Sequence, residues 1–114
     1  MVPPPLLSPA SYQILLALAG RDRHGYAIRK AVEHQTDGAL RLGPGTLYAA
    51  IRRLEDDGLI AESDWRPEED LDDPRRRYYR LTARGRAALI AETDRLQETV
   101  RRARRQLATR PRPA

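Results

Sequence analysis

Cysteine is absent from this sequence, which excludes disulfide bonds, thiolate metal sites and cysteine nucleophiles. Long apolar runs are absent too, since no segment approaches the roughly 20 apolar residues that a membrane-spanning helix needs. The N-terminal Met-Val-Pro-Pro-Pro-Leu-Leu has neither the basic flank nor the long apolar run of an export signal. These absences predict a cytoplasmic protein without a membrane partner.

The sequence also lacks the motifs of common enzymes. His24 and His34 are its only histidines, and it contains no Gly-x-Ser-x-Gly, no glycine-rich phosphate loop and no His-Glu-x-x-His. Five carboxylates crowd residues 68–73, but they lack the alternation and central glycine of a calcium loop, so a solvated loop is expected. The sequence therefore predicts no catalytic residues, no cofactor and no metal site.

Lysine is scarce whereas arginine is abundant, because Lys30 is the only lysine among 21 basic residues. The formal net charge of +5 points to a polyanionic partner for this one-domain chain of 114 residues. The planar guanidinium of arginine suits phosphate and guanine better than an ammonium group does. Amino-acid usage in a GC-rich genome would give the same excess, so the charge alone does not identify the partner.

Apolar periodicity and turn residues predict three helices followed by a β-hairpin, which is a winged helix-turn-helix. This makes the expected fold mainly α with a small β-hairpin. The predicted elements are a helix from Ser8-Pro9 to Gly20, a helix after His24-Gly25-Tyr26 that ends near Asp37-Gly38, a helix over 44–57, and strands over 60–65 and 76–81.

The helix over 44–57 has the pattern of a DNA-recognition helix. Leu47, Ile51 and Leu54 share one face, while small or cationic side chains project elsewhere. Glycines at the helix N-terminus let backbone amides approach a phosphate, which the helix dipole also favours. The residues expected to project are Thr46, Ala49, Ala50 and Arg53, and those at the N-terminus are Gly43, Pro44 and Gly45.

A final helix is expected over 83–108, too long for so small a domain to cover, with Thr82 as its N-cap. Two interleaved heptad series along it predict a coiled-coil seam and hence a homodimer. The alternative is that this face packs on the first helix, covering Ile14, Leu15 and Leu18, and both can hold together. The seam consists of Leu89, Thr93, Leu96, Val100, Ala103 and Leu107.

Four ordered motifs carry a family resemblance: His24-Gly25-Tyr26, Gly45-Thr46-Leu47-Tyr48, Arg53-Leu54-Glu55 with Gly58-Leu59-Ile60, and residues 76–82 with Gly85. With them the chain resembles the PadR family of bacterial transcriptional regulators over residues 10–108, in its compact branch with a single C-terminal helix. The resemblance implies a homodimeric repressor that binds a pseudo-palindromic operator in double-stranded DNA and is often released by a small aromatic effector. The competing reading is a winged-helix module that binds another protein.

For several side chains the sequence leaves two alternative roles open. Tyr48 is expected to contact phosphate or to pack in the core, and Thr46 to contact phosphate or to cap its helix. Arg53 is expected to read DNA or, like Arg52, to pair with Asp56 or Asp57 at i,i+4. On the returning strand, Arg75, Arg76 and Arg77 are expected to contact the DNA backbone or minor groove, while the acidic loop before them stays outside the groove.

Tyr12 and Trp65 are the candidates for stacking on an aromatic effector. Trp65 is expected rather to support the wing, which is the hairpin of the strands over 60–65 and 76–81 with the loop between them. The expected organisation is an N-terminal arm over 1–8, the winged helix-turn-helix over 9–82, the dimerisation helix over 83–108 and a disordered tail over 109–114.

Overall fold

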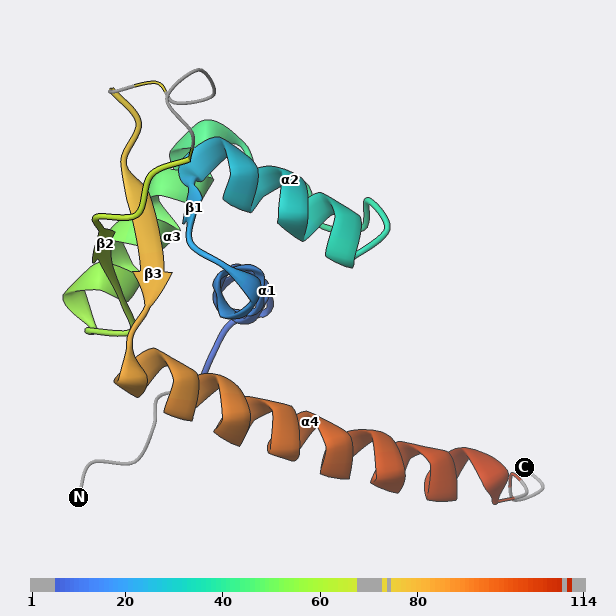
Figure 1. The fold of residues 1–114 in the computed structure, drawn as a ribbon. Helices are drawn as coiled ribbons and strands as arrows, with labels where there is room; N and C mark the ends of the chain where they lie inside the picture. The colour runs from blue at the N-terminus through green and yellow to red at the C-terminus, as the bar shows by residue number, and fades with distance from the viewer. Residues whose placement is uncertain (1–5, 68–72, 74, 110, 112–114) are drawn as a thin grey trace.

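The computed structural model describes residues 6–67, 73, 75–109 and 111. The predicted arm, acidic loop and tail therefore lie partly outside the described residues. The order of elements confirms a mainly helical winged helix-turn-helix with a long C-terminal helix (Figure 1). The elements are α1 (Pro9–Gly20), β1 (Arg23–His24), α2 (Gly25–Gln35), α3 (Pro44–Asp56), β2 (Ile60–Ser63), β3 (Tyr78–Leu81) and α4 (Ala83–Ala108).

Local side chains explain where the helices begin and end. Ser8 caps α1 by accepting a hydrogen bond from the backbone amide three residues on, and Pro9 takes the first helical position. Thr82 caps α4 in the same way, with its Oγ1 3.0 Å from the amide nitrogen of Gly85. The turn that follows α3 is closed by Gly58, whose φ of +74° lies in the left-handed region.

The hydrophobic core forms where α1 meets the other elements. Figure 1 shows α1 end-on near the centre, and α1 contacts α2, α3, α4 and β3. The apolar faces predicted from helical periodicity all point into this core, so each helix is held on the domain by one face. The buried side chains of the first three helices include Ile14, Leu15, Leu18, Ile28, Val32, Leu47, Ile51 and Leu54.

The sheet has three antiparallel strands in the order β1-β3-β2, one strand more than the predicted hairpin. β2 pairs with β3 so that Ile60 lies opposite Leu81 and Ser63 opposite Tyr78. β1 adds only two residues to the other edge of β3. A strand of two residues has no alternation of apolar and polar side chains, so the sequence pattern could not reveal it.

Both predicted strands prove two residues too long at the wing end. β2 stops at Ser63 instead of Trp65, and β3 starts at Tyr78 instead of Arg76. Beyond Ser63, the backbone amide of Trp65 donates to the Ser63 hydroxyl at 3.1 Å, and Arg66 Nη1 donates to the carbonyl of Arg76 at 2.6 Å. Side-chain contacts therefore replace the backbone ladder at the base of the wing.

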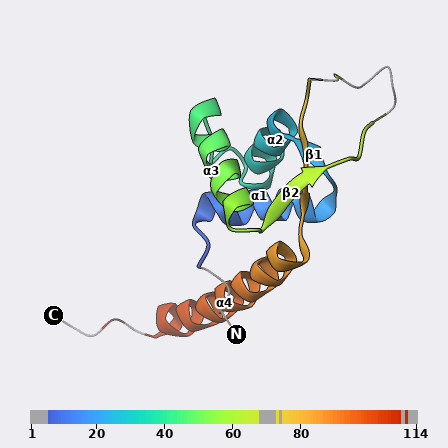
Figure 2. The same ribbon diagram turned by 90° about the vertical axis from the view of Figure 1, so that its left-hand side faces the viewer.

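α4 has a packed half and a protruding half. Its first turns lie against α1 and bury Ala88 and Leu89, whereas the rest of the helix extends away from the domain (Figures 1 and 2). At its first turn α4 approaches β2 so closely that a Cβ on Gly85 would lie 1.9 Å from the carbonyl oxygen of Leu59. Among the described residues, no helix is long and apolar enough to cross a membrane.

Candidate nucleic-acid interface

The outward face of α3 carries small and cationic side chains. Thr46, Ala49 and Arg53 are exposed, as the sequence predicted. The expectation that Ala50 projects with them is wrong, because Ala50 is half-buried and packs against the core. It follows Leu47 by three residues and so lies on the buried face of the helix.

The N-terminus of α3 is open to solvent. Gly43 is the N-cap and makes no side-chain capping hydrogen bond, and Pro44 takes the first helical position. A Cβ built on Gly43 or Gly45 would meet nothing within 4 Å, so no side chain blocks the approach to the backbone amides. Thr46 does not cap the helix, which leaves its exposed hydroxyl for another partner.

Tyr48 lies on the surface against the start of α2 and is not packed in the core. Its side chain is 48% exposed, and a Cβ at Gly25 would lie 2.5 Å from the Tyr48 hydroxyl oxygen. Gly25 therefore leaves the space that the Tyr48 ring occupies. In the sequence, His24-Gly25-Tyr26 marked only the start of a helix and one of the four ordered motifs. The role of Gly25 in positioning Tyr48 follows from the packing of α2 on α3.

A shallow hollow of about 390 Å³ joins α2, α3 and the returning strand of the wing. It brings Tyr48 together with all three arginines predicted on the wing. The sequence could not predict that these side chains lie together. Tyr26, which is exposed, also lines the hollow and was not among the predicted site residues. The lining residues are His24, Gly25, Tyr26, Tyr48, Asp73, Arg75, Arg76, Arg77 and Tyr79.

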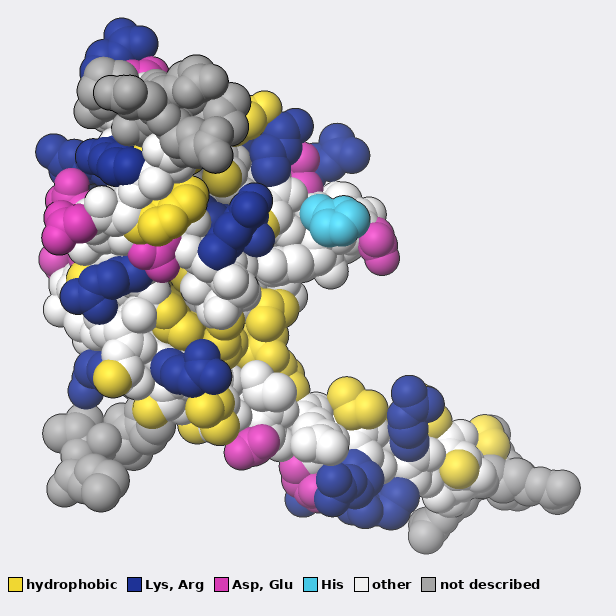
Figure 3. All heavy atoms as spheres, viewed as in Figure 1, with side chains coloured by type: hydrophobic (Ala, Val, Ile, Leu, Met, Phe, Trp, Pro, Cys, Tyr) yellow, Lys and Arg dark blue, Asp and Glu magenta, His cyan; other side chains and the backbone are white. Residues whose placement is uncertain are grey.

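Arginines dominate the charge around this hollow. Arg75, Arg76 and Arg77 are exposed, and Arg75 forms an ion pair with Asp73. Figure 3 shows basic side chains around the upper part of the molecule, next to the wing. On α3, the alternative pairing of Arg52 and Arg53 with Asp56 or Asp57 does not occur among the described side chains. The guanidinium of Arg53 is therefore available for an external partner.

His24 caps α2, because its Nδ1 accepts a hydrogen bond from the backbone amide of Ala27 at 3.2 Å. A protonated imidazole donates from both nitrogens and cannot accept this bond. Burial, followed by the charge of Arg76, lowers the pKa of His24 from its usual value of about 6.5. Between the two values the unfolded chain binds a proton that the folded chain does not, so the free energy of unfolding rises with pH in that range.

As the pH falls from about 7 to about 5, the protein is expected to lose on the order of 1 kcal/mol of stability through His24, the size of one N-cap. His24→Asn keeps a capping side chain but does not titrate, so its stability should fall less. Urea denaturation followed by circular dichroism at each pH measures both proteins. His34 is exposed and unchanged in both proteins, so it does not contribute to the difference between them. Equal losses in the two proteins would show that His24 is not the responsible group.

The predicted dimer seam on α4 is divided between the core and the solvent. Leu89 is buried against the domain, as the intramolecular alternative expected, and Leu96 is half-buried. Farther along α4, Val100 is 49% exposed and Leu107 is 84% exposed. Thr93 and Ala103 are exposed as well. The second half of the seam therefore has no intramolecular cover.

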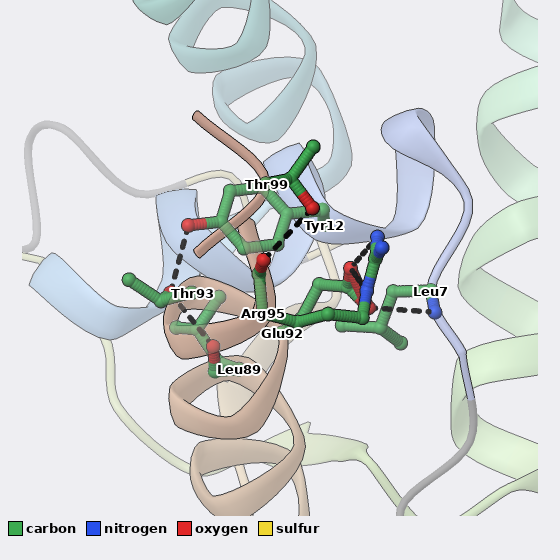
Figure 4. Close-up of polar contacts among 7 residues, drawn as sticks. All are labelled: Leu7, Tyr12, Leu89, Glu92, Thr93, Arg95 and Thr99. Atoms are coloured by element: carbon green, nitrogen blue, oxygen red, sulfur yellow. Dashed lines mark hydrogen bonds and ion pairs between the residues drawn. The ribbon is translucent and has the colours of Figure 1, made fainter. Parts of the chain in front are cut away.

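Polar contacts tie the first half of α4 to α1 and to the segment before it (Figure 4). The hydroxyl of Tyr12 lies 2.8 Å from that of Thr93, which in turn donates to the carbonyl of Leu89 at 2.7 Å. Glu92 is buried and accepts hydrogen bonds from the backbone amide of Leu7 and the guanidinium of Arg95. The hydrogen bond from Arg95 is the main cause that holds the pKa of Glu92 below its usual range.

Two exposed apolar side chains next to this junction lie outside the predicted heptad seam. Leu16 on α1 and Ile90 on α4 line an apolar groove of about 200 Å³, together with Ala19, Leu89 and other residues. Figure 3 shows apolar side chains in the inner corner between the domain and the protruding part of α4. Neither residue belongs to the seven-residue repeat, because the groove is made jointly by two helices that are distant in sequence.

The two aromatic candidates for an effector site lie in different places. Tyr12 is half-buried at the junction of α1 and α4, where its hydroxyl already pairs with Thr93. Trp65 packs edge-on against Tyr78 with ring centroids 5.4 Å apart, as expected of a side chain that supports the wing. The structure thus places Tyr12 at the junction of α1 and α4, whereas Trp65 lines a hollow with Arg76 and Tyr78.

The sequence of this chain is similar to those of known transcriptional regulators. The PadR-like family of transcriptional regulators matches residues 14–91, from α1 into the first half of α4. The transcriptional regulator Rv3488 of Mycobacterium tuberculosis is 38% identical over 79 residues, which are 69% of this chain and 57% of that protein. An uncharacterized 37.1 kDa protein in a transposon of Streptomyces fradiae is 45% identical over 83 residues, which are 73% of this chain and 21% of that protein. The chain thus spans about half and about a fifth of the length of these two relatives.

The fold is shared with solved regulators. The crystal structure of a PadR family transcription regulator from Clostridium difficile R20291 is 25% identical in sequence and superposes with a TM-score of 0.73. The match covers 89% of this chain and 100% of that one, so it includes the winged domain and most of α4. The chain belongs to the PadR-like family of transcriptional regulators.

Proposed function

We propose that this chain is a sequence-specific DNA-binding repressor that acts as a homodimer on a pseudo-palindromic operator. One observation carries the proposal: Tyr48, in the helix α3 whose N-terminus is open, lines one hollow together with the three wing arginines. The N-terminal end of α3 and the strand that returns from the wing lie at the end of the molecule opposite α4 (Figure 2). The end that would bind DNA is thus separate from the helix that would bind a second copy.

The outward face of α3 suits the major groove. Thr46 and Ala49 are small enough for the helix to approach the base edges, and Arg53 extends from the same face. The free amides at Gly43 and Gly45, with the positive end of the helix dipole, favour a phosphate at the mouth of the helix. Tyr48 and the wing arginines would then hold neighbouring phosphates around the hollow.

A homodimer through α4 would place two such helices on one face of the duplex. The uncovered apolar side chains Val100 and Leu107, with the groove around Leu16 and Ile90, supply the surface for a second copy. Two recognition helices related by a two-fold axis enter successive major grooves about 34 Å apart. The operator is then an inverted repeat with half-sites centred about 10 base pairs, or a multiple of that turn, apart.

Footprinting on the promoters next to the gene tests the proposal as a whole. A protected inverted repeat, with affinity that falls steeply as salt rises, is the expected result because binding releases counterions from phosphates. Weak binding to all duplexes without a salt slope would favour the alternative of a module that binds another protein.

Arg53→Ala is expected to weaken operator binding by about 1–3 kcal/mol, the discrimination of one bidentate contact to guanine, and to change binding to a scrambled duplex much less. Arg53 is exposed on the outward face of α3 and has no intramolecular partner among the described side chains that would compete with a base. Fluorescence anisotropy with operator and scrambled duplexes at one salt concentration measures the two losses.

Tyr48→Phe serves as the matched variant. It removes only the hydroxyl of a side chain at the rim of the hollow, so it should weaken both duplexes alike through the loss of one phosphate hydrogen bond. Equal losses for Arg53→Ala on both duplexes would show that Arg53 positions the helix and does not read the sequence.

Repression and release by a small aromatic effector complete the proposal. The junction of α1 and α4 supports an effector site better than the wing does, because Tyr12 and the apolar groove lie there, close to the surface proposed for dimerisation. A ligand bound at this junction could change the angle between the two winged domains and so their spacing on the operator. A reporter gene placed behind the operator tests repression. The same reporter with the Tyr12→Ala protein tests release by an effector.

A further inference from the structure

The carboxylate of Asp73 holds the first arginine of the wing. Its Oδ1 accepts hydrogen bonds from the backbone amide of Arg75 at 3.0 Å and from Arg75 Nε at 3.2 Å. Its Oδ2 accepts a further hydrogen bond from Arg75 Nη2 at 3.3 Å. An arginine fork binds a phosphate through the same two parallel contacts. The carboxylate therefore occupies the donors that Arg75 would offer to a DNA backbone.

This ion pair lies inside the proposed interface. Asp73 lines the same hollow as Arg76, Arg77 and Tyr48, so it places a negative charge where phosphates would approach. Hydrogen bonds from Arg75 lower the pKa of Asp73, which keeps the carboxylate ionised at neutral pH. The Arg75 side chain is 90% exposed, and ion pairs so open to water are weak enough for a phosphate to displace them.

We propose that Asp73 is an internal competitor for DNA phosphate at Arg75, a role that rests on the proposed DNA binding. Any duplex must displace the Asp73 carboxylate from the guanidinium before Arg75 can contact its backbone. Because the competition acts on a phosphate contact, it weakens binding to every sequence alike. The competition therefore reduces the fraction of the protein that is bound to the large excess of non-operator DNA. The base contacts of α3 still select the operator.

The experiment compares Asp73→Asn with Asp64→Asn, measured on a scrambled duplex over a range of salt concentrations. Asparagine at 73 keeps the backbone carbonyl that accepts a hydrogen bond from the amide of Arg76 at 2.9 Å, so the turn is retained. Asp64 is an exposed carboxylate near the end of β2 that does not line the hollow, and its change alters the net charge equally. Asp73→Asn should tighten binding about two- to fivefold per protomer beyond this control, and steepen the salt slope by about one.

The same two changes in an Arg75→Ala background isolate the pair. There, Asp73→Asn should have no larger effect than Asp64→Asn, because the guanidinium that Asp73 occupies has been removed. If Asp73→Asn still tightened binding more than Asp64→Asn in this background, the gain would be a general effect of charge. If Asp73→Asn weakened binding in the protein that keeps Arg75, Asp73 would position Arg75 for DNA. Either result overturns the inference while the protein still binds DNA. Absence of salt-dependent binding by every variant and by the wild type would instead overturn the proposed function.

Discussion

Gly85→Ala is expected to lower the free energy of unfolding by about 3 kcal/mol or more, the range of severe overpacking. The new Cβ would lie 1.9 Å from the carbonyl oxygen of Leu59, and backbone atoms cannot rotate away as a flexible side chain can. α4 would have to shift from the end of β2. That shift would strain the hydrogen bonds that Thr82 makes to the backbone of Leu59 at 3.2 Å and of Gly58 at 2.7 Å.

Gly20→Ala is the matched control for this prediction. Gly20 is the last residue of α1, and a Cβ there would meet nothing within 4 Å. Alanine at this helical position should be neutral or should stabilise the protein by up to about 1 kcal/mol, since it has the higher helix propensity. Urea denaturation followed by circular dichroism gives both values. Equal stabilities for the two variants would mean that α4 and β2 are not in the close contact described.

Leu96→Glu is expected to convert the proposed dimer into monomers. Leu96 lies at the centre of the heptad seam, between the part that packs on the domain and the uncovered part around Val100. In a two-fold dimer the change would bury two carboxylates close to each other. At a cost of about 2 kcal/mol or more for each, the dissociation constant should rise by about a thousandfold or more. Operator affinity should then fall to that of a single half-site.

Ala91→Glu adds the same charge to α4 without changing the seam. Ala91 is exposed and lies about 140° around the helix from Leu96, at about 100° per residue. Sedimentation velocity should therefore find this variant dimeric and Leu96→Glu monomeric, with equal helix content for both by circular dichroism. A dimeric Leu96→Glu variant would assign assembly to another surface, and the groove around Leu16 and Ile90 would be the first to test.

The sequence predicted the helices well because the signals that start and stop them are local. Ser8 with Pro9 begins α1, Thr82 begins α4, and Gly58 closes the turn after α3, as expected from capping rules. Periodicity identified the buried face of α3 correctly except at Ala50, where small size was taken for exposure. The four ordered motifs were enough to indicate the family.

The strands were predicted less well because strand pairing depends on residues that are far apart. β1 is too short for a pattern, and the wing strands end where side-chain hydrogen bonds replace the ladder. The heptad pattern likewise could not distinguish seam residues that pack within the protomer from seam residues that face solvent. Leu89 packs within the protomer and Leu107 faces solvent, although both belong to the same predicted seam.

By itself the sequence determined the order and limits of the helices, the exposed face of α3 and the basic character of the wing, because these depend on contacts within a few residues. Only the tertiary structure decided which of these groups meet. Gly25 leaves room for Tyr48, Gly85 lets α4 approach Leu59, and the hollow brings Tyr48 to the wing arginines. Such contacts follow from how helices and strands pack, and packing distances are not encoded in the spacing of residues along the chain.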